Sequence, residues 1–172
     1  MQGRKILCAA LATIVITSLP NAGISQQKAL KDQLVGTWTL VSWEAVNVDG
    51  SIGVPIDGID PRGQLIFTDN GRFSYQVITN IPKFKINDRL KATPEENNAV
   101  ARGSLSQFGT FTVNETDRSF TLRIERSTFA NQNDTDNNKR LVTSITADEL
   151  KYSNFGRAAG GQNNTVWKRL AP

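Results

Sequence analysis

The fold of this chain is indicated first by the stretch Leu34-Val35-Gly36-Thr37-Trp38-Thr39-Leu40-Val41-Ser42-Trp43-Glu44. Gly-Thr-Trp opens a run that is rich in strand-forming residues and places apolar side chains on both faces. We therefore predict a long first strand, residues 38–46. Trp38 and Trp43 lie five residues apart, so a regular strand would turn them to opposite faces, and they need not share one role.

Most of the remaining chain alternates between short strand patterns and polar turns. A hairpin is predicted around Asn70-Gly71, because Asn-Gly between two alternating runs is a strong hairpin signal. Gly, Pro, Asp and Asn concentrate in loops at residues 47–63, 131–138 and 154–164. Further strands are predicted at residues 64–68, 72–78, 108–113, 119–126, 140–146, 149–153 and 165–170.

One helix is predicted in the middle of the chain. Thr93-Pro94-Glu95-Glu96 is a capping box with Pro at the first helical position, and the helix should run to about Ser106. Its apolar side is thin, so we expect it to lie on a sheet or across one end of a barrel. Eight or nine short strands with one helix predict an all-β protein, an antiparallel sandwich or an up-and-down barrel.

Residues 1–25 have the pattern of a secretory signal peptide, with Arg4 and Lys5 before an apolar run and small residues after it. The apolar run is short for a membrane span, so we expect an exported protein, periplasmic or secreted, with residues 26–172 as one domain. Of the 20 Lys and Arg, 18 lie after residue 25, against 16 Asp and Glu. The net charge of residues 26–172 is therefore close to zero, which favours neither a nucleic-acid partner nor a membrane span.

The chain contains no histidine, and its single cysteine, Cys8, lies in the expected signal peptide. Histidine-dependent catalysis and common zinc sites are thereby excluded. Asp57, Asp60, Asp134 and Asp136 lack the spacing of a calcium loop. We therefore assign no catalytic residue, metal site or cofactor. The sequence gives no oligomeric state.

Five separated motifs together resemble the bacterial lipocalin-like domain family over about residues 33–170. They are Leu34-Val35-Gly36-Thr37-Trp38, Gly63 to Thr68 with Asn70-Gly71-Arg72, Ala92-Thr93-Pro94-Glu95-Glu96, Phe108-Gly109-Thr110-Phe111 and Val166-Trp167-Lys168-Arg169. The resemblance implies a small antiparallel up-and-down (lipocalin-like) β-barrel of 8–9 strands with one helix. It also implies a cup for a small apolar or amphipathic molecule.

Several aromatic residues are candidates for the walls of such a cup. Trp43, Tyr75, Phe111 and Tyr152 come from different predicted strands, as lining residues would. The competing interpretation is that they pack a β core, for which large apolar side chains are the usual material.

Polar candidates lie on the strand that ends the second hairpin. Arg123, Glu125 and Ser127 share one face, while Phe120, Leu122 and Ile124 share the other. Alternation favours the apolar face inside; the alternative turns the polar face inward to orient a ligand. In a regular strand Arg126 lies on the same face as Phe120, Leu122 and Ile124. It therefore either reaches solvent at the end of the strand or is a buried cation that needs an anionic partner.

The two tryptophans receive different predictions. Trp38 should lie at the closed end with Arg169 of the last strand over its ring, a contact that lipocalins also use. Trp43 is the tryptophan that could contact a ligand. The alternative is that Trp43, on the strand face opposite to Trp38, points outward against the helix.

The leading functional hypothesis is an exported protein that binds a small apolar or amphipathic molecule in its barrel without transforming it. One alternative is a small isomerase, cyclase or hydratase using Tyr75, Arg123 or Glu125 as acid–base groups. Another is an envelope interaction protein without a ligand pocket, recognisable by an exposed apolar patch.

Overall fold

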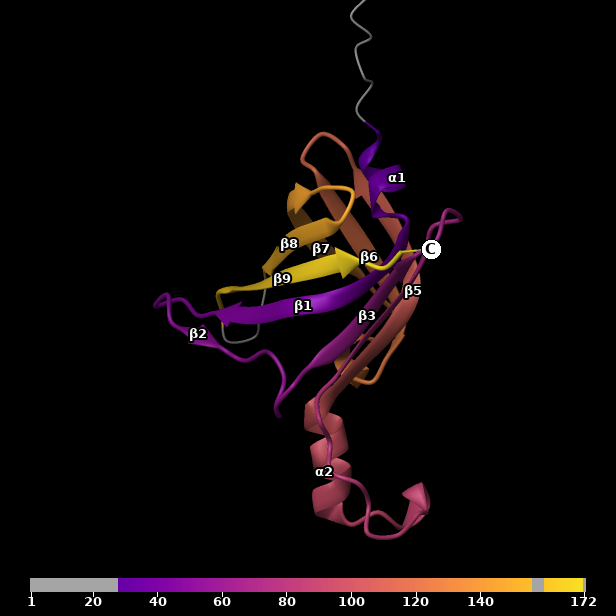
Figure 1. The fold of residues 1–172 in the computed structure, drawn as a ribbon, viewed down its shortest axis with the longest axis vertical. Helices are drawn as coiled ribbons and strands as arrows, with labels where there is room; N and C mark the ends of the chain where they lie inside the picture. The colour runs from indigo at the N-terminus through magenta and orange to yellow at the C-terminus, as the bar shows by residue number, and fades with distance from the viewer. Residues whose placement is uncertain (1–27, 156–159, 172) are drawn as a thin grey trace, which may run out of the picture.

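The computed structural model describes residues 28–155 and 160–171, and the predicted signal peptide lies outside this part of the chain. Nine antiparallel strands form one sheet, and pairing of the first strand with the last closes it into a barrel (Figure 1). The all-β barrel with one mid-chain helix is confirmed. The strands are β1 (Gly36–Val46), β2 (Ile52–Gly53), β3 (Arg62–Phe67), β4 (Arg72–Ile78), β5 (Ser104–Asn114), β6 (Ser119–Ser127), β7 (Thr135–Ile145), β8 (Glu149–Phe155) and β9 (Gln162–Arg169).

Strand β1 pairs with two long strands, β3 and β9, and so completes the ring. Trp38 is opposite Leu65 of β3 on one side and opposite Arg169 of β9 on the other. All other neighbours in the barrel are consecutive strands, which is the up-and-down arrangement. The two-residue strand β2 pairs only with the end of β1. Closure leaves the eight longer strands with no free edge.

One end of the barrel is closed by the short helix α1 (Leu30–Leu34). Leu30 and Leu34 are buried in the core, and the Glu115 carboxylate accepts the backbone N–H groups of Leu30 and Lys31 at 2.9 and 3.3 Å. Helix α1 is thereby fixed over this end of the barrel.

Arg169 joins α1, β1 and β9 at this closed end. Its guanidinium carbon lies 3.9 Å from the centroid of a Trp38 ring, so the predicted contact is present. The same group donates to the carbonyl oxygens of Val35 at 2.7 Å, Gln33 at 2.5 Å and Ala147 at 2.6 Å.

Gly36 makes room for this arginine. It has a φ of +135°, and a Cβ at this position would lie 2.5 Å from Arg169 Nη1. The Gly-Thr-Trp motif thus combines a glycine that admits the arginine with a tryptophan that receives it.

The mid-chain helix α2 (Pro94–Gly103) has the predicted capping box but not the predicted position. It does not lie across the barrel; it projects from the end of the barrel opposite α1 and leads into β5 (Figure 1). The physical reason is its thin apolar side, since Gly103 is its only buried residue. Backbone bonds tie its last turn to the loops, from Thr79 N–H to Gly103 O and from Asp57 N–H to Arg102 O.

The segment predicted as a loop at residues 131–138 is also different. A short 3-10 helix, η2 (Ala130–Gln132), is followed by β7, which begins at Thr135. A register shift opposite Leu122 and Ile124 allows this polar segment to pair with β6. Bulged pairing accepts Asn and Asp residues that regular strand patterns disfavour.

We predict that Arg169→Ala lowers the free energy of unfolding by about 2–4 kcal/mol, because charge-assisted hydrogen bonds and a cation–π contact are lost together. Urea unfolding followed by circular dichroism measures this. Lys168→Ala is the matched control, since Lys168 is the exposed neighbour on the same strand, and it should change stability by less than about 0.5 kcal/mol. Equal losses in both variants would contradict a closing role for Arg169.

Candidate functional site

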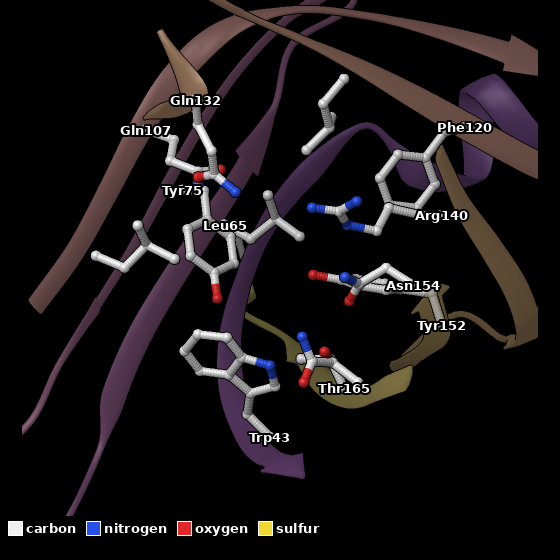
Figure 2. Close-up of a pocket in the computed structure, with 13 residues that line it drawn as sticks. Trp43, Leu65, Tyr75, Gln107, Phe120, Gln132, Arg140, Tyr152, Asn154 and Thr165 are labelled. Atoms are coloured by element: carbon white, nitrogen blue, oxygen red, sulfur yellow. The ribbon is translucent and has the colours of Figure 1, made fainter. Parts of the chain in front are cut away.

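A cavity of about 70 Å³ lies inside the barrel, on the side of the core away from α1. All eight barrel strands contribute to its wall, and η2 adds one side chain. Figure 2 shows these side chains converging from opposite walls. They are Trp43, Leu65, Tyr75, Leu105, Gln107, Phe120, Leu122, Gln132, Arg140, Tyr152, Asn154, Asn163 and Thr165.

A β-bulge in β1 brings Trp43 into this wall. Leu40 is opposite Trp167 and Ser42 is opposite Val166, so Val41 is an extra residue, and its side chain is 61% exposed. An extra residue reverses the alternation beyond it. Trp38 and Trp43 therefore both face the interior despite their odd spacing.

Aromatic rings meet edge to face around the cavity. Tyr75 lies between two tryptophans, with centroid distances of 6.2 Å to Trp43 and 5.6 Å to Trp167. On the other side, Phe120 and Tyr152 have centroids 5.3 Å apart. Such contacts fix ring orientations, so the walls are pre-formed.

Arg140 of β7 is the central charged group of the cavity. Its guanidinium is directed into the cavity, with Leu65 and Tyr75 opposite and Tyr152 and Asn154 on its own side (Figure 2). No carboxylate lines the cavity in the described part of the chain, and Arg140 makes no ion pair there. Its neighbours are the Tyr152 hydroxyl and the Lys139 carbonyl oxygen at 3.3 Å.

Amide groups make the rest of the wall polar. Gln107 Nε2 donates to Gln132 Oε1, which holds η2 against β5. Asn163 Oδ1 is buried and has no hydrogen-bond partner within residues 28–155 and 160–171. An unpaired acceptor in a cavity wall is available to a ligand or a water molecule.

Burial shifts the ionisation of the central groups. It raises the pKa of Tyr75 well above the usual value of 10.0, and it also raises the pKa of Tyr152. Burial lowers the pKa of Arg140, an effect that the neighbouring Tyr152 and Tyr75 oppose. Near neutral pH the site therefore holds two protonated phenols and one guanidinium cation.

The aromatic residues predicted as walls divide into two groups. Trp43, Tyr75 and Tyr152 line the cavity. Phe111 is buried in the core below it, with its ring centroid 4.7 Å from that of Phe67.

The predicted polar face of β6 lies outside the barrel. Phe120, Leu122 and Ile124 are buried, as alternation favours, and Arg123 is exposed. Glu125 forms a two-bond ion pair with Arg72 at 2.8 and 3.0 Å. Neither Arg123 nor Glu125 lines the cavity, so the geometry does not place them where a ligand in the barrel would contact them.

Arg126 also points outward, although its parity in a regular strand would be inward. A bulge at Glu125 reverses the alternation, because Phe108 pairs with Arg126 and Gly109 pairs with Ile124. Arg126 Nη1 bonds Asp134 at 2.8 Å on the surface. Ser127 is the last residue of β6, where it pairs with Gln107 and its Oγ accepts the Phe129 N–H at 3.0 Å. Neither residue lines the cavity.

Sequence reasoning missed the residue at the centre of the site. Arg140 shares its strand face with Val142, which is buried, and it pairs across the sheet with Phe120. Arg126 was a candidate because it shares a strand face with apolar residues, and the same reasoning applies to Arg140. The assignment of residues 131–138 to a loop concealed how far β7 extends.

Within the described residues, no three His, Cys, Asp or Glu side chains come together in a geometry suited to a metal ion. No helix in the same residues is both long and apolar enough to cross a bilayer.

The chain belongs to the lipocalin-like domain family, whose model matches residues 35–170. A solved structure of a redesigned β-barrel is 15% identical and has a TM-score of 0.42; the match covers 86% of this chain and all of that one. No curated protein matches this sequence.

The chain has only two tyrosines, and both line the cavity. Because folding raises both pKa values above about 10, we predict that the free energy of unfolding is insensitive to these groups below pH 10 and falls as pH rises above it. Phenolate absorbance should appear together with loss of circular dichroism. In the Tyr75→Phe variant, the free energy of unfolding should fall less steeply with pH above pH 10. Phenolate formation near pH 10 in the folded protein would contradict this.

Proposed function

We propose that the protein is an exported lipocalin-like binding protein whose barrel takes up a small amphipathic molecule with a negatively charged head group. The observation that carries the proposal is Arg140, a guanidinium that projects into the cavity where no carboxylate of the described residues lines the wall. A desolvated cation without an anionic partner is costly, and an anionic ligand would supply the missing charge.

The size and polarity of the cavity favour a small acid over a long-chain lipid. Its volume of about 70 Å³ is well below the roughly 300–1,000 Å³ of sites that enclose drug-sized ligands. It has room for a carboxylate and a few carbon atoms, with any remainder extending toward the mouth. The amides of Gln107, Gln132 and Asn163 suit a ligand with further hydrogen-bonding groups.

The same wall favours binding over catalysis. Of the three groups suggested for an enzyme, Arg123 and Glu125 lie outside the cavity, and burial holds Tyr75 in its protonated form. No lining side chain within the described residues readily accepts a proton near neutral pH. Export is supported by the signal-like pattern of residues 1–25.

We expect hexanoate and benzoate to bind more tightly than their uncharged amides, hexanamide and benzamide. Arg140→Met should weaken binding of the two acids by roughly ten- to a hundredfold, since a hydrogen bond to a charged group contributes about 1.5–3 kcal/mol. Isothermal titration calorimetry measures the affinities, and so does intrinsic tryptophan fluorescence, because Trp43 is the one of the three tryptophans that lines the cavity. Arg123→Met is the matched control, because Arg123 lies on the outer face. Equal binding of acids and amides would refute the proposed head group.

The stability of the same variant provides a second test. Methionine keeps much of the volume of Arg140 and removes a desolvated cation, so the free energy of unfolding of the unliganded protein should stay the same or rise by about 1 kcal/mol or more. Most buried substitutions have the opposite effect. A clear loss of stability in urea unfolding would show that Arg140 is a structural residue and would remove the main support for the proposal.

A further inference from the structure

The segment between β4 and α2 ends in a projecting tip, residues 83–91. Its sequence is Lys83-Phe84-Lys85-Ile86-Asn87-Asp88-Arg89-Leu90-Lys91, in which cationic and large apolar residues interleave. Figure 1 places this segment at the far end of α2, away from the barrel. It includes the 3-10 helix η1 (Arg89–Lys91).

Two of the three large apolar residues of the tip are largely exposed. Leu90 is 90% exposed and Ile86 is 55% exposed, while Phe84 is partly buried. Single exposed apolar residues are common on protein surfaces. A group of them on a projecting element, separated by cations, is the composition of segments that bind at the surface of a membrane.

The acidic groups near the tip shape its backbone. Asp88 caps η1 by accepting the Leu90 N–H at 3.0 Å, and it pairs with Lys91 at 3.5 Å. Glu96 of α2 accepts the backbone N–H groups of Lys85 and Thr93, both at 2.8 Å. These bonds hold the tip in one conformation.

The remaining cations face outward. Lys83, Lys85 and Arg89 are exposed and form no ion pair within the described residues. Glu95, in the first turn of α2, and Glu96 are the nearest carboxylates on that helix, and Glu96 partly offsets Lys85. The surplus of positive charge therefore lies with the exposed aliphatic side chains.

We propose that this tip docks the protein on an anionic lipid surface. Ile86 and Leu90 enter the boundary between head groups and acyl chains, and Lys83, Lys85 and Arg89 contact the lipid phosphates. Charge complementarity selects an anionic surface over a zwitterionic one. The contact is peripheral and reversible, since the inserted segment is short.

The position of the tip relates this surface to the cavity. The segment that carries it leaves the barrel at Ile78, the end of β4, and returns at Ser104, the start of β5. Leu105 and Gln107, the first inward side chains of β5, line the cavity. Docking through the tip thus brings this end of the barrel to the lipid surface, where amphipathic molecules partition. The inference does not depend on Arg140.

Co-sedimentation with vesicles tests the proposal. We expect the purified full chain to bind vesicles of equal parts phosphatidylglycerol and phosphatidylcholine, to bind pure phosphatidylcholine much less, and to be released by salt. Lys83→Gln with Lys85→Gln should reduce the partition coefficient at least tenfold, because each cation contributes roughly fivefold at such a surface. Arg123→Gln with Lys168→Gln, exposed on the barrel wall, is the matched control.

A second pair of variants tests the apolar contribution. Leu90→Glu should abolish vesicle binding, whereas Val41→Glu, at an exposed aliphatic residue of the barrel wall, should leave it unchanged. All variants keep the same residues 1–27, so any contribution from these residues is common to them. Equal binding to both vesicle types, or unchanged binding of the tip variants, would overturn the proposal. Tip-dependent self-association in sedimentation velocity without vesicle binding would assign the tip to a second copy instead.

Discussion

The rest of the structure depends on the pairing of β1 with β9, which makes a ring of an otherwise open sheet. Arg169 reinforces this pairing at one end, where a single guanidinium contacts the Trp38 ring and three backbone carbonyl oxygens, two at the end of α1 and one at Ala147. A closed ring has an interior that neighbouring strands must either fill or leave open. Here aromatic and aliphatic side chains fill the end near α1, and a mixture of aromatic, aliphatic and polar side chains surrounds the small space beyond them.

Irregular pairing determines which side chains occupy that space. The extra residue Val41 turns Trp43 inward, and the extra residue Glu125 turns Arg126 outward. Each bulge reverses the alternation only beyond its own position, so one strand presents different faces to the core and to the cavity. These two insertions in the pairing therefore place Trp43 in the cavity wall and keep Arg126 out of it.

Much of the fold follows from local sequence signals. The Asn70-Gly71 hairpin, the Thr93 capping box and the contact between Trp38 and Arg169 are each encoded by a few residues in a fixed arrangement. The site follows less readily, because inward and outward positions were assigned by strict alternation and a bulge leaves no clear mark in one sequence. The Asn and Asp residues before Arg140 favour a loop and make Arg140 the first residue of its predicted strand, whereas pairing with β6 extends β7 back to Thr135. The capping box predicts where α2 begins but not where the helix packs. Its position depends on how little apolar surface the helix has to bury.

The unequal ends of the barrel have a consequence for its motions. Hydrogen bonds from Arg169, the packing of Leu30 and Leu34, and the cluster of Phe67, Phe111 and Phe120 all lie toward α1. The opposite end is bounded by loops, the two-residue β2 and the projecting α2. Local opening is easiest where few apolar contacts resist it. Amide protection should therefore decline along each strand from α1 toward the mouth, so that the cavity can exchange its contents by fraying at the rim while the ring itself stays closed.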